Sequence, residues 1–359
     1  MKILDRYVAR EFLRFLGLVL ATFVVLYLLI DFFEKIRMFM SNAATVRQVV
    51  THFLYTIPMI VTQTLPAAVL LASLITFGTL SRHGEITAMK AGGISLYRIA
   101  APVVAIAAAI CGLLFLFSEY VTPKTYEKAE YIRLVEVQKK ESLGTFKQNA
   151  IWYRGKDGIY NFKFFDVQRN EIQGITIHYL KDMSEISMRI DAERAEWKDG
   201  KWIFHNLLIT RFPKDDFPQL ERVRQQVVAM PETPADFQVV QKNTEEMGFF
   251  ELREFVRKLQ SEGYDATRYI VDMHGKVAFS LVSLILAVIG AAFSVRSERS
   301  GGVVQSIGAG IVLGFSYWII FAFGLSLGRS GTIPPLLAAW SANLLFGAGA
   351  VFLFKRLRT

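Results

Sequence analysis

Long stretches without charge alternate with short charged segments along the chain. Six such stretches hold 16, 34, 20, 19, 29 and 25 residues, at positions 15–30, 48–81, 99–118, 277–295, 300–328 and 330–354. A helix needs about 20 apolar residues to cross the hydrocarbon core of a bilayer. The pattern therefore predicts six transmembrane helices. The first stretch is short, but Phe12 and Phe33 extend it, and the second and fifth are long enough to include a turn or an interfacial segment.

The middle of the chain follows a different pattern. Mixed charged residues continue the third helix outward from about Thr122, and after Leu143 apolar and polar positions alternate with period two. Asp199-Gly200 and Asp157-Gly158 are hairpin signals. Successive short strands without helices favour an antiparallel sandwich or a jelly roll. We expect strands at 150–153, 160–167, 174–180, 186–197, 202–212 and 221–230, and then a helix over 249–262.

These elements define the fold class. We expect an α-helical membrane protein with six transmembrane helices, arranged three plus three, and an inserted all-β, jellyroll-like domain. The predicted divisions are 1–121 for the first three helices, 122–265 for the β domain with its helical connectors, and 266–359 for the last three helices.

Charge is segregated in the same way. The chain has 359 residues, of which 52% are hydrophobic and 20% charged, and its net charge is +9. Residues 119–271 hold 24 Lys/Arg and 25 Asp/Glu, whereas the rest of the chain holds 17 and 7. The positive charge thus belongs to the apolar ends, which is not how a nucleic-acid-binding patch is built. The single cysteine, Cys111, excludes a disulfide framework.

The basic residues of the short loops predict the orientation. Twelve Lys/Arg lie at the two termini and in the second and fourth loops, whereas four lie in the other loops. Cytoplasmic loops carry the excess of Lys and Arg. We therefore expect both termini in the cytoplasm and the β domain outside, which is the periplasm in a bacterium with two membranes.

No motif for catalysis or for a metal is present. The chain contains no HExxH, GxSxG or phosphate-loop pattern. The two histidines of the middle region, His178 and His205, fall on expected strands and are interpreted as plain strand residues. We expect no catalytic residue, no metal and no cofactor in this chain, and no ATP bound by it alone.

The loop over about 82–95 is rich in helix-forming residues. Glu85–Ala91 can form a short helix that Gly92-Gly93 ends, with Glu85 favoured near the helix N-terminus. One interpretation is an interfacial helix between two spans. The other is a docking helix for a cytoplasmic partner, anchored by Glu85, since permeases of ABC transporters carry such helices with a Glu and Gly pattern.

Several motifs occur together in this architecture. They are Leu4-Asp5-Arg6-Tyr7, the run Glu85-Ile-Thr-Ala-Met-Lys-Ala-Gly-Gly-Ile-Ser95, the return stretch from Leu252 to Tyr269, and Ile333-Pro334-Pro335 before the last span. In this order the chain resembles the LptF/LptG family of lipopolysaccharide export permeases over nearly its whole length. The opening motif and the return stretch are more similar to LptG.

The resemblance implies an assembly. A member of this family pairs with a homologous permease, here LptF, and with two copies of the cytoplasmic ATPase LptB, which binds the ATP. It works with LptC and its transmembrane helix and with the periplasmic LptA bridge. Lipopolysaccharide would enter from the outer leaflet of the inner membrane and pass along stacked β-jellyroll domains towards the outer membrane.

The resemblance also implies site residues. The coupling helix to the ATPase matches Glu85, Arg82, Met89 and Gly92. The candidate lipopolysaccharide-binding cations are Lys35, Arg37 and, more weakly, Arg133; the alternative for the first two is ordinary anchoring at the interface. Asp31 occupies a position that is basic in some family members, and it is expected to pair with one of the two cations.

Two further groups of residues have open interpretations. Gly310, Gly314 and Gly324 form small-residue patterns that could line a lateral gate against the partner permease, or only pack within the chain. Asp272, His274 and Lys276 open the fourth span, where interfacial anchoring is favoured over an ion path.

Three other functions remain as alternatives. An ion-coupled transporter would need ionisable residues within the spans, which are nearly free of charge. A membrane-anchored receptor or scaffold would bind a partner through its β domain and would not need Glu85. A membrane enzyme acting on lipids would need a nucleophile or a metal cluster.

Overall fold

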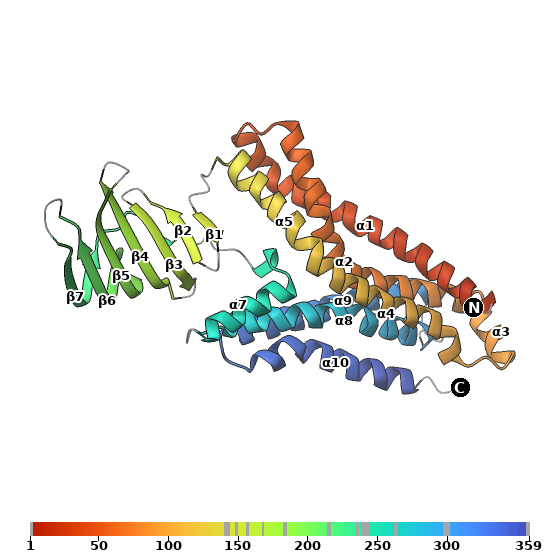
Figure 1. Cartoon of the computed structure of the whole chain (residues 1–359). Coiled ribbons are helices and arrows are strands. Elements are labelled where there is room, and N and C mark those ends of the chain that lie inside the picture. The colour runs from red at the N-terminus through yellow and green to blue at the C-terminus, as the bar shows by residue number, and fades with distance from the viewer. Residues whose placement is uncertain are drawn as a thin grey trace. The chain divides into compact units, whose positions relative to one another are not determined.

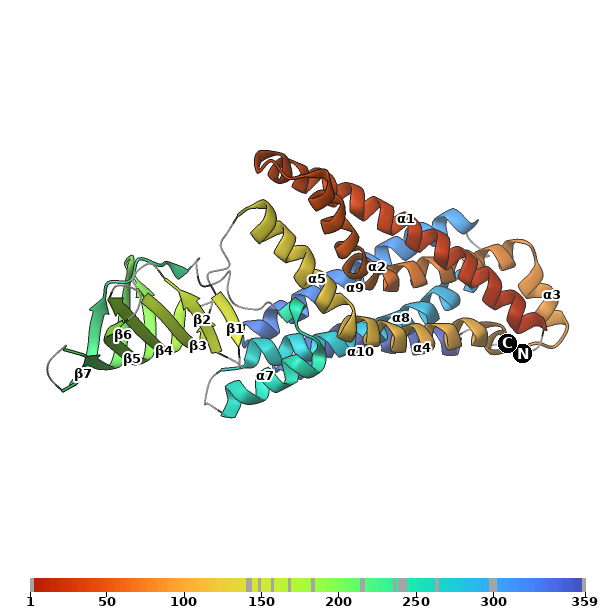
Figure 2. The same ribbon diagram turned by 45° about the horizontal axis from the view of Figure 1, so that its top comes forward.

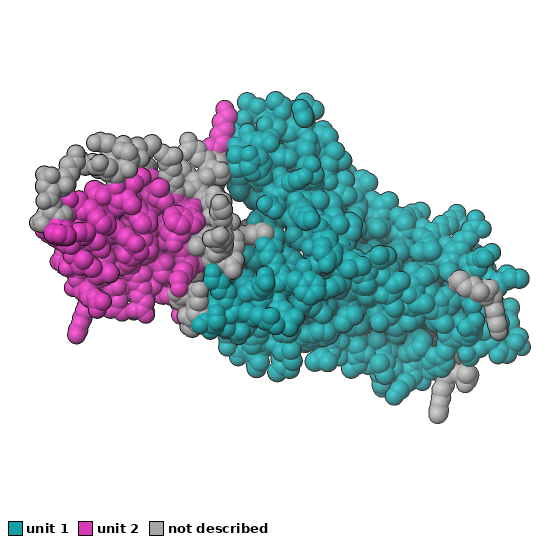
Figure 3. All heavy atoms as spheres, viewed as in Figure 1, with its two compact units in different colours: residues 1–138, 244–359 teal, residues 139–243 magenta. Residues whose placement is uncertain are grey.

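The chain forms two compact units, which Figure 3 shows in different colours. One unit contains residues 1–138 and 244–359, and the other contains 139–243. The computed structural model describes residues 3–139, 144–147, 150–155, 158–166, 169–181, 185–213, 217–234, 237, 244–261, 265–296 and 302–356. The connectors at 122–138 and 244–261 belong with the helical unit rather than with the sheet.

Six helices are long and apolar enough to cross a membrane, which confirms the predicted number within the described residues. They are α1 (Ile3–Ser41), α2 (Val46–Arg82), α4 (Leu96–Tyr120), α8 (Thr267–Arg296), α9 (Gly302–Arg329) and α10 (Pro335–Arg356). The shorter helices of this unit are α3 (Glu85–Ala91), α5 (Thr122–Tyr131), the π-helix η1 (Ile132–Val137), the 3-10 helix η2 (Thr244–Glu246) and α7 (Phe249–Ser261). The start of α1, the end of α10 and α3 lie at one end of this unit (Figures 1 and 2).

The second long apolar stretch is a single helix, so the turn that its length allowed is absent. α2 runs without interruption from Val46 to Arg82 and contains Pro58 and Pro66. A capping box begins it, in which Thr45 accepts a bond from the Gln48 backbone and the Gln48 side chain accepts one from the Thr45 backbone. Neighbouring helices make proline tolerable inside such a span because they support the freed backbone groups.

Small and aromatic side chains pack the helical unit. One cluster of buried residues joins α1, α2, α3, α4 and α8 and includes Phe12, Phe77 and Ile99, none of which is exposed. A second joins α2, α8, α9 and α10. Within it the Tyr317 hydroxyl donates to Asn343 Oδ1 at 2.7 Å, and Asn343 Nδ2 donates to the Ala278 carbonyl at 2.7 Å.

The inserted unit is one antiparallel sheet of seven described strands. They are β1 (Gly144–Lys147), β2 (Ala150–Arg154), β3 (Gly158–Asp166), β4 (Glu171–Lys181), β5 (Glu185–Lys198), β6 (Lys201–Arg211) and β7 (Gln219–Val228). Each strand pairs with the next in sequence. Asp199 and Gly200 both have positive φ, 53° and 76°, so the predicted hairpin is confirmed. The Asp157 half of the other hairpin signal lies outside the described residues.

The sheet curls around a single aromatic side chain. Phe237 is fully buried and its ring contacts those of Tyr153 on β2, Phe162 on β3 and Trp202 on β6. Strands this far apart in a flat sheet could not reach one residue, because neighbouring strands are about 4.8 Å apart. The expected inserted β domain is confirmed, and its strand order is a sequential meander, without crossovers among the described strands.

The core of the sheet supplies a stability prediction. Trp202 is 1% exposed and its indole N–H donates to the Glu232 carbonyl at 2.7 Å. Truncating it to alanine removes a large buried surface and the hydrogen bond to that carbonyl. We expect Trp202→Ala to lower the free energy of unfolding of this unit by about 3–5 kcal/mol. Pulse proteolysis of the full chain in urea measures the change.

A matched control is available on β2. Trp152 is 44% exposed, so Trp152→Ala should change the unfolding free energy by less than about 1 kcal/mol. Equal effects of the two substitutions would contradict the placement of Trp202 in the core.

Candidate coupling helix and outer basic residues

Two glycines set the limits of the short helix α3. Gly84, its N-cap, has φ +70°, and Gly93, one residue beyond the C-cap Gly92, has φ +78°. Residues other than glycine rarely adopt this left-handed backbone conformation. The Gly92 and Gly93 N–H groups donate to the carbonyls of Ala88 and Lys90. The sequence prediction of a helix over Glu85–Ala91 that ends at Gly92-Gly93 is confirmed.

One side chain anchors this helix to the spans. Ile86 is 1% exposed and belongs to the same buried cluster as Phe12 and Leu96, and Met89 packs partly buried against that cluster. Thr87 and Lys90 are exposed. α3 therefore covers the ends of the spans with one face and leaves its other face open.

The residues predicted for coupling lie together at this end. Arg82, the last residue of α2, is exposed, and so is Gly92. The Glu85 side chain is 34% exposed and lies 4.0 Å from His83 Nδ1. The Tyr7 hydroxyl of α1 lies against the same carboxylate. Glu85 thus keeps part of its surface open while α1 holds it from one side.

At the opposite end of α1, Asp31 pairs with Lys35. The ammonium of Lys35 lies 2.9 Å from Asp31 Oδ1, and the two side chains are 29% and 11% exposed. The expectation that Asp31 pairs with one of the two neighbouring cations is confirmed for Lys35. Arg37 is exposed and makes no ion pair with any residue that the structure describes.

The third candidate cation is also paired. Arg133, in η1, donates through Nε to Glu130 Oε2 at 2.9 Å, and a second guanidinium nitrogen contacts Glu130 Oε1. This hydrogen bonding raises the pKa of Arg133 above its usual value. Its charge is therefore partly compensated within the chain.

The candidate gate glycines contact helices of the same chain. A Cβ at Gly310 would contact the Leu74 side chain, and one at Gly314 would lie 3.5 Å from Leu70. A Cβ at Gly324 would lie 2.7 Å from the Ala338 carbonyl oxygen of α10. Packing within the chain accounts for these glycines, and a gate role remains a prediction.

The strand histidines have ordinary surroundings. The pKa of His178, on β4, lies below its usual value, mainly because the side chain is buried. The nearby positive charge of Arg189 lowers it further. His205, on β6, lies 3.6 Å from a Glu196 oxygen. In the described parts of the chain no three His, Cys, Asp or Glu side chains gather as a metal site would require.

Sequence reasoning missed one feature of the helical unit. The Asp272 carboxylate of α8 accepts bonds from Arg329 of α9, with both nitrogen contacts at 2.7 Å. The sequence pattern did not predict this pair, because 57 residues separate the partners. Acids and cations are both rare in the spans, so an acid near the start of α8 and a cation at the end of α9 could have suggested the pair.

Comparison with known proteins decides the family. The model of the lipopolysaccharide export system permease LptF/LptG matches residues 6–356. The chain belongs to the LptF/LptG family. It is 24% identical to the lipopolysaccharide export system permease protein LptG of Haemophilus influenzae over 364 residues, which is 99% of both chains. It is 22% identical to LptG of Escherichia coli strain K12 over 368 residues, 99% of this chain and 98% of the relative.

These matches confirm the resemblance to the family and the greater similarity to LptG. They cover the six spans and the inserted sheet together. The family is therefore shown for the whole architecture and not for one motif.

Two glycine-to-alanine substitutions should affect the melting temperature differently. Gly324→Ala should lower the melting temperature of the purified chain, because the new Cβ would meet the Ala338 carbonyl and the Ser341 hydroxyl, both at 2.7 Å. Gly349→Ala, on α10 with nothing within 4 Å, should leave the melting temperature unchanged or raise it, since alanine favours a helix by about 1 kcal/mol over glycine. Thermal unfolding in mild detergent measures both, and a lower value for both variants or for neither would contradict this packing.

Proposed function

We propose that this chain is the LptG-type permease subunit of a lipopolysaccharide exporter. It takes lipopolysaccharide from the outer leaflet of the inner membrane and passes it to a periplasmic β-jellyroll bridge. The observation that carries the proposal is a match to the permease family over nearly the whole chain, together with an anchored helix α3 whose outer face is free. The protein has no catalytic role of its own, and a partner ATPase supplies the energy.

The proposed topology follows the basic residues. The start of α1, the end of α10 and α3 lie at one end of the helical unit, and in this proposal that end is cytoplasmic (Figure 1). The β domain then lies in the periplasm. Its partners are LptF in the membrane, two copies of LptB in the cytoplasm, LptC, and LptA in the periplasm.

Two spans offer apolar surface to the partner permease. α1 and α9 are the least buried of the six candidate spans within the described chain. Phe315 and Phe323 of α9 are 67% and 66% exposed, and Phe33 of α1 is 72% exposed. We propose that these two helices face LptF or lipid, and that a lateral gate involving α9 uses this exposed side.

The coupling role of α3 predicts an effect on ATP turnover. We propose that the ATPase binds around Glu85, with Arg82, Met89 and Gly92 in the same contact. Both Glu85→Ala and Glu85→Arg should then weaken co-purification of the ATPase, or lower ATP turnover by about tenfold, which corresponds to the loss of one charged contact. The measurement is co-expression with the second permease and the ATPase, purification in mild detergent, and an ATPase assay.

Lys355→Glu is the control for this prediction. It reverses an exposed charge at the end of α10, at the same end of the helical unit as α3 (Figure 1), and should leave ATP turnover unchanged. If the chain purifies alone and the Glu85 variants behave like wild type, the membrane-anchored receptor or scaffold becomes the better explanation.

The outer cations differ in how available they are for a phosphate. Arg37 is exposed without a described ion pair, whereas Lys35 must first leave Asp31. A photo-crosslinking amino acid at position 37 should therefore label lipopolysaccharide more strongly than one at position 35. Arg37→Ala should reduce the lipopolysaccharide retained by the purified complex about tenfold, the cost of a charge-assisted contact.

The exposed cation Lys124 of α5 provides the comparison, and Lys124→Ala should retain as much lipopolysaccharide as wild type. Equal retention by the Arg37 and Lys124 variants would remove Arg37 from the binding site.

A further inference from the structure

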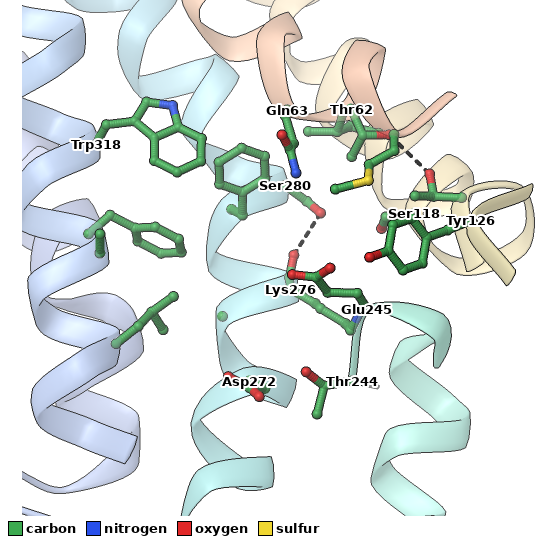
Figure 4. Close-up of a pocket in the computed structure, with 18 of the residues that line it drawn as sticks. Thr62, Gln63, Ser118, Tyr126, Thr244, Glu245, Asp272, Lys276, Ser280 and Trp318 are labelled. Atoms are coloured by element: carbon green, nitrogen blue, oxygen red, sulfur yellow. Dashed lines mark hydrogen bonds between the residues drawn. The ribbon is translucent and has the colours of Figure 1, made fainter. Parts of the chain in front are cut away.

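A cavity of about 370 Å³ lies within the helical unit, between α2, α4, α5, η2, α8 and α9. Figure 4 shows its two kinds of wall. Trp318 and the neighbouring Phe321 and Phe279 form an apolar side. Hydroxyl and amide groups line the other side, among them Gln63 and Tyr126. This volume is typical of a site for a small ligand.

Two opposite charges line this cavity, and neither makes a hydrogen bond or an ion pair with a described residue. Lys276, on α8, is partly buried, and its ammonium makes no hydrogen bond or ion pair with any described residue. Glu245, on η2, also lines the cavity and makes no ion pair within the described chain. Its carboxylate and those of Asp272, Glu119 and Glu251 attract the Lys276 ammonium from beyond ion-pair distance. Asp272 lies one turn from Lys276, but Arg329 already occupies its Oδ1 atom.

The carboxylates around Lys276 leave its ammonium without a hydrogen-bonding partner among the described residues. Removing an ammonium from water is costly unless it is paired, and ionisable groups within membrane spans usually have a functional partner. Here the two groups are not paired with each other, since their nitrogen and oxygen atoms do not come within ion-pair distance. A ligand that carries both a phosphate and a cation would satisfy Lys276 and Glu245 together.

We propose that this cavity binds a zwitterionic phospholipid of the phosphatidylethanolamine class. The phosphate would accept bonds from Lys276, and the primary ammonium would donate to Glu245. An acyl chain would lie along Trp318 and Phe321. A primary ammonium suits the carboxylate better than a quaternary one, because it donates hydrogen bonds. The cavity lining includes no residue of α3 and none of Lys35, Arg37 and Arg133, so this proposal does not depend on the proposed function.

The test uses the full chain, purified in mild detergent and stripped of lipid. Phosphatidylethanolamine, phosphatidylcholine and phosphatidylglycerol with the same acyl chains are added at equal concentration, and native mass spectrometry counts the lipid retained. Wild type should retain phosphatidylethanolamine over the other two by about tenfold, the worth of one charge-assisted contact. Lys276→Met should lose this retention by about tenfold, and Lys276→Arg should keep it.

The Glu245→Gln variant distinguishes lipid binding in the cavity from a purely structural role of its charged residues. Glu245 is exposed on η2, so its substitution should leave the fold intact, and it should remove the preference for phosphatidylethanolamine over phosphatidylglycerol. Lys124→Met and Glu127→Gln, both at exposed positions of α5, are the matched controls and should behave like wild type.

Three outcomes would overturn the proposal. The first is retention by the Lys276→Met and Glu245→Gln variants equal to that of the controls. The second is equal retention of all three lipids by wild type. The third is displacement of phosphatidylethanolamine by lipopolysaccharide, with Lys276→Met weakening lipopolysaccharide retention, since the cavity would then belong to the path of the exported lipid.

Discussion

The close crossing of α2 and α8 holds the helical unit together. The β insert separates these helices in sequence, so their contact joins the first three spans to the last three. A Cβ at Gly290 would lie 2.8 Å from Ser73 Cβ and 2.9 Å from the Leu70 carbonyl oxygen, so the backbones meet without a side chain between them. The Ser294 hydroxyl donates to the Leu74 carbonyl at 3.0 Å beside this point. Helices in a bilayer associate through such small residues and hydrogen bonds, since lipid provides no hydrophobic driving force between them.

α2 also links the two ends of the unit. At one end it leads into α3, and towards the other it holds the helices that follow the third span. His52 Nδ1 lies 2.9 Å from the Ala129 carbonyl of α5, and the Thr62 and Thr122 hydroxyls lie 3.0 Å apart. A helix of 37 residues is about 55 Å long at 1.5 Å per residue. In the coupling role that we propose, a displacement of α3 would therefore move a continuous, packed element that reaches the side where the candidate lipid-binding cations lie.

Local patterns predicted the elements well, because each depends on neighbouring residues. The uncharged stretches located all six spans, and Asp199-Gly200 located a hairpin, since positive φ at both positions favours that pair. The hydrophobic and charge patterns could not predict contacts between residues that are distant in the sequence. The burial of Phe237 among rings from three strands, and the pairing of Asp272 with Arg329, depend on the fold and not on spacing. The length of the second stretch suggested a turn, whereas neighbouring helices keep α2 continuous through its two prolines.

The local features of the candidate site were predictable from the sequence, and its long-range contacts were not. The end of α3 followed from Gly92 and Gly93, which act locally, whereas the role of Gly84 as its N-cap came from the structure. The availability of the basic residues followed only in part, because the sequence indicated that Asp31 pairs with one of two cations but not with which one, and it did not indicate the partner of Arg133. Lys35 and Arg133 both proved to be paired within the chain, and only the structure distinguishes them from Arg37.

Acids are so scarce in the apolar ends of the chain that each one is informative. Residues outside 119–271 contain seven Asp and Glu against 17 Lys and Arg. Asp5 pairs with Arg98 and Asp272 with Arg329, so these two acids join ends of different helices, whereas Asp31 pairs with Lys35 within α1. Glu85 is different, because its ion-pair contact in the described chain is a histidine at 4.0 Å and a third of its side chain is exposed. A carboxylate that the fold holds in place but does not neutralise is available to a cation from outside the chain, and this availability supports the coupling role that we propose for α3.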